Sequence, residues 1–388
     1  MLVFQVLRII RRCARLSPAA RSPMVGSRIA GTCNAGSLIP KPGVSWPAIP
    51  AVLMAMALIP GARAADEELD ACLKRQGSRQ DIIRHCTAAA GQPGLSDTRH
   101  AAVLNQRGLT RLAEGAMAEA HQDFDDAIRL DATLASTWNS RAVLFLQQGE
   151  AARAVADEEQ AVKLSPKYAF AWANLGQARL MNRDLAGALA AESEALRLAP
   201  ANVELVYVGR AKAYLAQRDY AAAKADLEAA LQANPRYANA LSGLAVLQVC
   251  QGDFAAAAQA FRREREVRPD DESAIDLVMA LQRAGQDASK ELATLTRNLD
   301  EKQGIPTGLA LFMEKATPEQ VLGSTQDHDP WMQRQRSCRA QYQVAEWYLV
   351  HGKSGPARQA LEQARQSCDP SQSSYAPAVA ELSRLSGH

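Results

Sequence analysis

A period of 34 or 35 residues runs through the middle of this 388-residue chain. One alanine returns in each period, and a second alanine follows it by seven residues in four of the five periods. The first series is Ala120, Ala154, Ala188, Ala223 and Ala257, and the second is Ala127, Ala161, Ala195 and Ala230, with Glu264 in the fifth place. Self-similarity at this period indicates small structural units that stack to bury a shared core. The middle of the chain is therefore expected to form a solenoid.

Each period predicts two helices. We number the positions of the five full units from their first residues, which are Ala101, Ala135, Ala169, Glu204 and Ala238. Positions 4, 7, 8 and 11 combine large and small side chains on one helical face, because a helix turns by about 100° per residue. The alanines at positions 20 and 27 fall on the second helix, and a proline closes four of the units, where it cannot continue that helix. The sequence predicts paired helices that approach closely at their small residues.

This pattern resembles the tetratricopeptide repeat family. The segment Trp172-Ala-Asn-Leu-Gly176, followed by Ala188, Ala195 and Pro200, carries the likeness most clearly. The resemblance implies an all-α fold, a right-handed α-α superhelix, with five full units and one degenerate unit over residues 98–299. It also implies a non-catalytic scaffold that binds a protein or peptide in a concave groove.

Helical segments are expected on both sides of the array. Residues 65–97 predict a helical-hairpin cap, and residues 300–388 predict a C-terminal helical extension with a final repeat-like unit from Cys338. The stretches 308–322 and 338–349 resemble bacterial periplasmic adaptors of the new-lipoprotein-I type. That resemblance implies an adaptor of the cell envelope, often a homodimer. The lipid-bearing cysteine of those adaptors is absent, so the resemblance does not extend to membrane anchoring.

Residues 1–64 predict a leader. They hold eight Lys and Arg residues and no Asp or Glu, and the apolar run 51–59 precedes Ala62-Arg63-Ala64. This arrangement is typical of a signal peptide cleaved after Ala64, which favours a periplasmic or secreted protein. Import into an organelle is the alternative, because the stretch is rich in arginine and free of acid. The apolar run is shorter than the roughly 20 residues of a membrane span, so no integral membrane span is expected.

The body without this leader is mildly acidic. Lys and Arg fall from 44 to 36 while Asp and Glu stay at 42, so the net charge becomes 36 − 42 = −6. Binding to nucleic acid depends on a basic surface that neutralises phosphates. Nucleic acid is therefore not an expected partner.

Four cysteines are expected to form two disulfides. Cys72 and Cys86 flank a turn between two short helices, and Cys338 and Cys368 fall at the two ends of another hairpin. A helical hairpin brings such residues opposite each other, and disulfides persist in oxidising compartments. The alternative is four buried thiols. The remaining Cys250 is expected to be an inert core thiol.

One helical face is left over after the packing positions are assigned. Positions 2, 5, 9 and 12 lie roughly 120° from the packing face and are expected to line the inner surface of the array. The residues expected there are Asn105, Leu109, Leu112, Asn139, Val143, Leu146, Phe170, Gln177, Leu180, Leu205, Val208 and Lys212. An exposed apolar surface of this size predicts a partner. The alternative is a structural subunit or homodimer of an envelope assembly in which the chain's own C-terminal helices or a second copy fill the groove.

Position 24 departs from the family pattern. It is apolar in three units but is Glu158 and Glu192 in the two central ones. An unpaired buried carboxylate is costly, so we expect these side chains to reach the surface or to pair with a nearby arginine. A seam that receives a partner's cation is the alternative.

No arrangement of residues predicts catalysis, a cofactor or a metal. Gly352-Lys353-Ser354 lacks the preceding glycine of a phosphate-binding loop, and the six histidines show no metal-ligand spacing. The sequence therefore predicts a non-catalytic scaffold with no cofactor.

Overall fold

The computed structural model describes residues 60–198, 200–298 and 305–387, and within these every regular element is a helix. The apolar run 51–59 and most of the expected leader lie outside the described residues, and Ala64 lies within the first described helix. The cap and array helices are α3 Pro60–Leu73, α4 Arg79–Ala90, α5 Asp97–Ala113, α6 Met117–Leu130, α7 Ala135–Gln147, α8 Ala151–Leu164, α9 Ala169–Met181, α10 Leu185–Arg197, α11 Val203–Gln217, α12 Tyr220–Ala233, α13 Ala238–Gln251 and α14 Phe254–Val267. The later helices are α15 Asp271–Arg283, α16 Ser289–Asn298, α17 Thr307–Phe312, α18 Pro318–Gly323, α19 Pro330–Val350, α20 Ser354–Ser367 and α21 Tyr375–Leu385.

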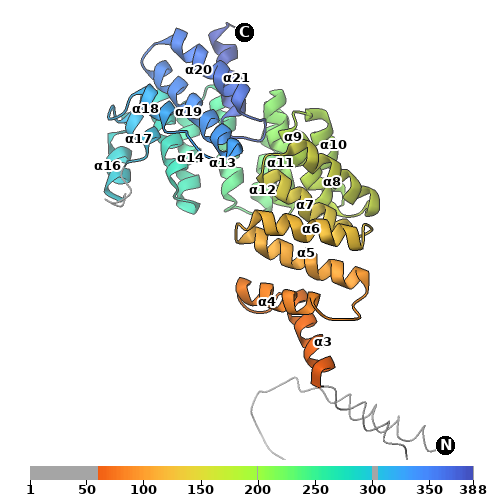
Figure 1. The fold of residues 1–388 in the computed structure, drawn as a ribbon. Coiled ribbons are helices and arrows are strands. Elements are labelled where there is room, and N and C mark those ends of the chain that lie inside the picture. Colours follow the sequence, from red (N-terminus) through yellow and green to blue (C-terminus); the bar gives the residue numbers. More distant parts are fainter. Residues whose placement is uncertain (1–59, 199, 299–304, 388) are drawn as a thin grey trace, which may run out of the picture. The chain divides into compact units, whose positions relative to one another are not determined.

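The helices from α5 to α14 form five stacked pairs (Figure 1). Each first helix contacts its own second helix and the first helix of the next pair, so α5, α7, α9, α11 and α13 lie in one row. The recurring alanines at positions 20 and 27 are at most 1% exposed, which shows that they are the contact points between helices. The expected fold, an all-α solenoid of repeated helical pairs, is confirmed.

The side chain at position 24 lies in a socket formed by two successive first helices. A Cβ atom added to Gly108 would lie 2.6 Å from the ring of Phe124, and one added to Gly243 would lie 2.4 Å from Leu227. Real side chains do not approach this closely, so glycine permits the contact. Gly108 belongs to the same unit as Phe124, whereas Gly243 belongs to the unit after Leu227, so position 24 is packed from both sides.

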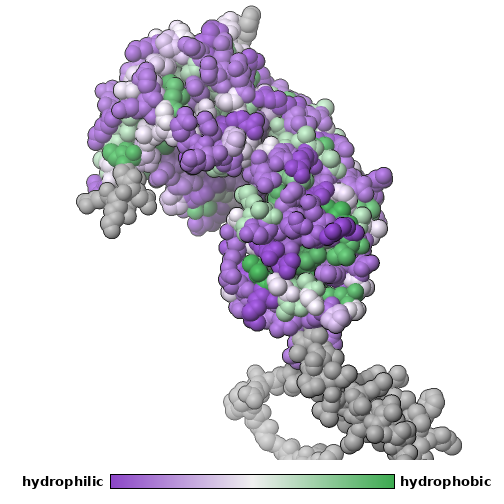
Figure 2. Space-filling view, in the orientation of Figure 1, coloured by the Kyte–Doolittle hydropathy of each residue, from purple (hydrophilic) through white to green (hydrophobic). Residues whose placement is uncertain are grey.

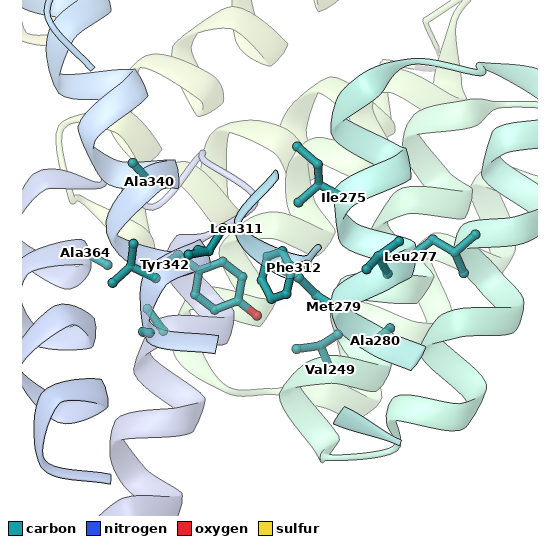
Figure 3. Close-up of a cluster of buried hydrophobic side chains, with 14 of the residues drawn as sticks. Val249, Ile275, Leu277, Met279, Ala280, Leu311, Phe312, Ala340, Tyr342 and Ala364 are labelled. Carbon is teal, nitrogen blue, oxygen red and sulfur yellow. The ribbon is translucent and has the colours of Figure 1, made fainter. Parts of the chain in front are cut away.

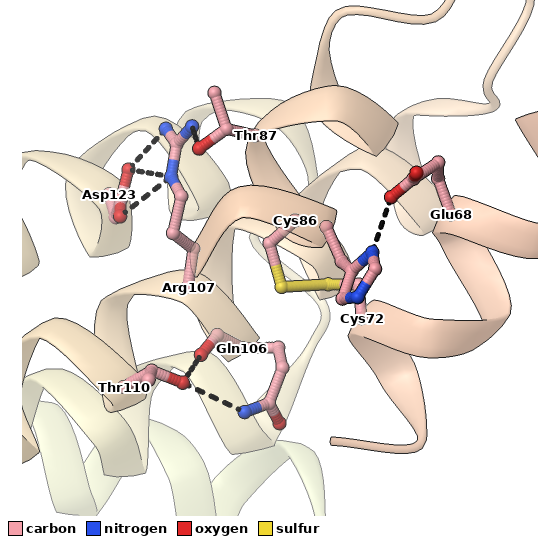
Figure 4. Close-up of a disulfide and its surroundings, with 9 residues drawn as sticks. Glu68, Cys72, Cys86, Thr87, Gln106, Arg107, Thr110 and Asp123 are labelled. Carbon is pink, nitrogen blue, oxygen red and sulfur yellow. Dashed lines mark hydrogen bonds and ion pairs between the residues drawn. A yellow bond between two sulfur atoms is a disulfide. The ribbon is translucent and has the colours of Figure 1, made fainter. Parts of the chain in front are cut away.

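A disulfide-bonded hairpin precedes the array (Figure 4). Cys72 of α3 and Cys86 of α4 form a disulfide with an Sγ–Sγ distance of 2.05 Å. Ser78 begins α4, where its hydroxyl accepts from the backbone N–H of Asp81 while the Asp81 carboxylate accepts from the backbone N–H of Ser78. This reciprocal cap fixes the turn between the two cysteines.

The C-terminal helices build the largest apolar cluster in the described residues. Side chains from α13, α15, α17 and α19 meet there, with Phe312 and Tyr342 between Val249 and Ala340 (Figure 3). Cys338 and Cys368 form the second disulfide, with an Sγ–Sγ distance of 2.09 Å. Helix α19, which contains Cys338, begins at Pro330, where Asp329 caps it and accepts from the backbone N–H of Trp331.

Candidate protein-binding surface

The row of first helices exposes two large apolar side chains near its middle, at the starts of α9 and α11. Phe170 is 41% exposed and Leu205 is 45% exposed, and Gln177 on the same face is also exposed. Asn105, Leu109, Asn139 and Val143 are half-buried beside them. We call these seven residues the upstream surface. Figure 2 shows apolar side chains among hydrophilic ones on the array, whereas the C-terminal helices are mostly hydrophilic in this view.

Four of the expected surface residues are buried. Leu112, Leu146, Leu180 and Val208 are between 2% and 8% exposed. The position-12 leucines pack within the array, and Val208 packs against the C-terminal helix, so all four offer little area to a partner. Sequence periodicity gives the direction of a side chain but not what lies above it.

Amide groups contribute the polar part of the upstream surface. The side-chain amide of Asn174 donates to the side-chain oxygen of Asn139 at 3.0 Å. The side-chain oxygen of Asn105 is buried and has no hydrogen-bond partner among the described residues.

The C-terminal helix covers the downstream end of the same row. Ala376 and Ala380 of α21 pack in one cluster with Val208 and Leu215 of α11. Arg384 donates to the carbonyl oxygens of Cys250, at 2.9 Å, and Val249, at 3.0 Å. We call the surface of α11 and α13 that faces these contacts the downstream surface.

Two further contacts fasten the C-terminal region to the array. Arg183, in the turn of the third unit, donates to the carbonyl oxygen of Cys368 at 2.6 Å and lies 5.5 Å from the ring centre of Tyr375. Trp331 packs on the turn of the second unit, where a Cβ added to Gly149 would lie 2.2 Å from the indole. The C-terminal region therefore contacts units two to five.

A buried charge cluster ties α15, α19 and α21 together. Arg283 donates to the carboxylates of Glu346 and Glu381, and Arg384 donates to Glu381 at 2.5 Å. Both carboxylates are at most 2% exposed. Burial raises the pKa of Glu346 to about 7, while Arg283 opposes this shift. The partners are 63 and 98 residues apart in the chain, so no local pattern in the sequence indicated them.

Arginine–aspartate pairs link the two helices of three units, and the sequence analysis missed them. Position 7 is arginine and position 23 is aspartate in the first, second and fourth units. The pairs are Arg107–Asp123, Arg141–Asp157 and Arg210–Asp226, with closest N···O distances of 2.6, 2.7 and 2.7 Å. The third and fifth units place leucine and alanine at the same two positions. Positions 7 and 23 thus change together from one unit to the next, and this is the sequence signal that would have predicted the pairing.

The expectation for Glu158 and Glu192 was wrong. Glu158 is 0% exposed and Glu192 is 3% exposed, and neither forms an ion pair among the described residues. Burial raises the pKa of Glu158 to about 9, with a small opposing effect of Asn174, and raises that of Glu192 well above its ordinary value. Arg141 and Arg210 bind Asp157 and Asp226 instead, so burial without an ion-pair partner favours the protonated form of both glutamates.

Chemistry other than binding has little support in the described residues. No group of His, Cys, Asp and Glu in this part of the chain could hold a metal ion. Cys250 is buried, and burial raises the pKa of its thiol to about 12, which disfavours the reactive thiolate. Of the helices described, none is long and apolar enough to cross a membrane.

Comparison with known proteins identifies the repeats. Residues 139–203 and 208–272 match the family model described as tetratricopeptide repeat. A sequence search of curated proteins found no match. The structure is similar to PilW, a type IV pilus biogenesis factor, with 18% identity and a TM-score of 0.49 over 52% of this chain and 96% of that chain.

Two other solved structures are similar at the same level. Cut9–Hcn1 of the APC/C gives 14% identity and a TM-score of 0.49 over 86% of this chain and 58% of that chain. A tetratricopeptide repeat protein from Parabacteroides merdae gives 14% identity and a TM-score of 0.48 over 76% of this chain and 99% of that chain. No function is transferred from these likenesses. Residues 139–203 and 208–272 thus match the tetratricopeptide repeat model, and the array that contains them is an all-α solenoid of paired helices.

Proposed function

We propose that this protein is a non-catalytic scaffold or adaptor that binds an extended segment of another protein on its upstream surface. The observation that carries the proposal is the exposure of Phe170 and Leu205, two large apolar side chains at the same position of successive units. Burying them would supply affinity. The exposed amide of Gln177 would orient a peptide backbone.

We also propose that the protein works in the bacterial cell envelope. Two disulfides in the described residues support an oxidising compartment, and the expected leader supports export. The resemblance of the C-terminal region to periplasmic adaptors supports the same placement. Organellar import remains the alternative location.

The alternative arrangement, in which the protein's own chain fills the groove, has support at one end only. Helix α21 packs on α11 and α13, whereas Phe170 and Leu205 stay exposed. The upstream surface is therefore uncovered and open to a partner or to a second copy of the chain.

Substitution of two exposed residues tests the proposal. Phe170→Asp with Leu205→Asp should abolish recovery of crosslinked partners from intact cells, because charged side chains oppose apolar burial. The matched control is Leu73→Asp, since Leu73 is 42% exposed but lies in α3. Helicity and melting temperature should stay unchanged in both. Unchanged partner recovery by the double variant, or equal loss in the control, would contradict the proposal.

Mass measurement in solution separates a partner from a second copy. If the upstream surface forms a homodimer, the same double variant should convert dimers to monomers. A monomeric wild-type protein would exclude this arrangement and leave a different protein as the occupant.

A further inference from the structure

Helix α15 and the C-terminal helices enclose a cleft of about 590 Å³. Its walls are α15, α17, the residues around the end of α18, the first part of α19 and the loop that leads into α21. None of the seven residues of the upstream surface lines it, and Lys212, which was expected in the groove, lines a smaller neighbouring cavity beside α11. Small-molecule sites usually measure about 300–1,000 Å³, so the cleft has room for one small ligand.

Two buried polar side chains line the cleft without a hydrogen-bond partner. Gln343 of α19 and Ser374 of the loop are each 5% exposed, and neither side chain bonds to any residue that the structure describes. Their polar atoms are not among those that the described chain seals completely from solvent, so a molecule in the cleft can reach them. Buried polar groups are normally hydrogen-bonded, so these two groups indicate a ligand that supplies their partners.

The neighbouring elements hold the amide groups at the wall of the cleft. A Cβ atom added to Gly308 of α17 would lie 2.5 Å from Oε1 of Gln343, closer than real side chains approach. Gln372 donates to Oε1 of Gln335 and accepts from the backbone N–H of Asp369 at 2.8 Å. The Nε2 group of Gln335 is left without an acceptor in the described part of the chain. The wall therefore offers both donors and acceptors.

The charged side chains that line the cleft are paired. Arg339 pairs with Glu272 at 3.3 Å and with Asp276 at 3.2 Å. Arg336 pairs with Asp327 at 3.1 Å. A charged ligand would find no free counterion on this wall, so a neutral ligand is expected.

One side of the cleft is apolar. Trp331 and Met332, at the start of α19, line it together with Val321. Met332 is 42% exposed, and the indole N–H of Trp331 has no acceptor among the residues described. An apolar surface beside amide and hydroxyl groups matches a molecule that has a C–H face and a rim of hydroxyls.

We propose that this cleft binds a neutral saccharide of about one or two sugar rings. Each sugar hydroxyl both donates and accepts, as do the Gln343 amide and the Ser374 hydroxyl. The C–H face of a pyranose ring packs on Trp331 and Met332. The saccharide thus completes the hydrogen bonds that the described chain leaves unmade, and the site does not depend on the partner proposed for the upstream surface.

Calorimetric titration of the full chain with glucose, N-acetylglucosamine, cellobiose and diacetylchitobiose tests the proposal. Millimolar or tighter binding of at least one of these is expected, and glucuronic acid should bind no more tightly than glucose, because the cleft has no free cation. Failure of all four to bind at tens of millimolar, or tighter binding of glucuronic acid, would overturn the proposal. Tighter binding of the capped dipeptide N-acetyl-glycylglycinamide than of any saccharide would indicate a polypeptide ligand and would also overturn it.

Matched variants locate the binding. Gln343→Leu should weaken binding of the tightest saccharide at least tenfold, whereas Gln341→Leu, on the same helix but outside the cleft, should leave it unchanged. Because no described residue bonds to the Gln343 amide, its loss should not lower the melting temperature.

Ser374→Ala provides a second variant that removes only a hydroxyl, and it should weaken saccharide binding about threefold or more. Unchanged binding by Gln343→Leu, or by Ser374→Ala if the first variant does not fold, would overturn the assignment. Phe170→Asp with Leu205→Asp should bind the saccharide as the wild type does, so this result is independent of partner recovery.

Discussion

The upstream and downstream surfaces have the same repeat architecture but different coverage. Upstream, Phe170 at the start of α9 is 41% exposed. Downstream, Val208 and Val249 are 4% and 6% exposed, because C-terminal residues pack over α11 and α13. A repeat position therefore becomes surface or core according to what packs on it. The downstream surface is part of the folded body, whereas the upstream surface is the region we propose for a partner.

The largest expected effect comes from breaking the charge cluster that holds the downstream cover. Arg283→Met leaves Glu346 and Glu381 without their shared cation, and removal of one partner from a buried pair costs about 3–5 kcal/mol. Hydrogen exchange should accelerate in α13, α15 and α21 while α5 and α7 stay protected. Arg129→Met is the control, since its side chain is 77% exposed. Uniform acceleration over all units would show that the two ends unfold together.

The two disulfides sharpen the same comparison. The C-terminal disulfide joins cysteines that are 30 residues apart in the sequence, and the cap disulfide joins cysteines that are 14 residues apart. Loop-closure entropy then gives about 3.6 and about 3 kcal/mol of stabilisation. Cys338→Ser with Cys368→Ser should loosen α19 to α21, whereas Cys72→Ser with Cys86→Ser should loosen only α3 and α4. Exchange mass spectrometry distinguishes these patterns, and identical profiles for the two double variants would contradict the assignment.

The arginine–aspartate pairs can be tested against the third and fifth units, which have leucine and alanine at the same two positions. Arg141→Leu alone should destabilise the protein by about 1–3 kcal/mol, because Asp157 stays buried without its hydrogen-bonding cation. Arg141→Leu with Asp157→Ala copies the third and fifth units and should lie within about 1 kcal/mol of wild type. Urea unfolding measures both variants. A double variant as unstable as the single one would mean that the second unit requires its charges.

The buried glutamates make the free energy of unfolding depend on pH. Counted per pH unit, this is the smallest of the expected effects. Folding raises the pKa of Glu158 from its ordinary 4.5 to about 9, so the folded state binds this proton more tightly. The stabilisation is complete below pH 4.5 and is lost as the pH rises toward 9, by at most about 1.4 kcal/mol per pH unit.

Glu158→Gln should therefore reduce the slope of unfolding free energy against pH and stabilise the protein above pH 7. The neighbouring Glu159→Gln is the control, because Glu159 is exposed. The remaining slope would come from other buried acids, among them Glu192 and Glu346. An unchanged slope in Glu158→Gln would show that this carboxyl is ionised in the folded protein.

The repeat architecture was predictable because it depends on periodic small residues. Ala154 and Ala161 are buried at the contacts that their spacing indicated. The surface was predictable only in part, since Leu146 points inward and Val208 is covered by a helix about 170 residues later in the chain. The raised pKa of Glu158 could not be predicted from its residue type, because it depends on how completely the fold buries the side chain.

The shared socket at position 24 limits how freely repeats can be exchanged. Glu192 of the third unit packs so closely on Gly209 of the fourth that an added Cβ would lie 2.3 Å from its carboxylate oxygen. Excision of the third unit would set Glu158 against Gly209 in place of Asn174. Every junction is thus matched across two repeats, so a change in repeat number by duplication or loss would need compensating substitutions at the new junction.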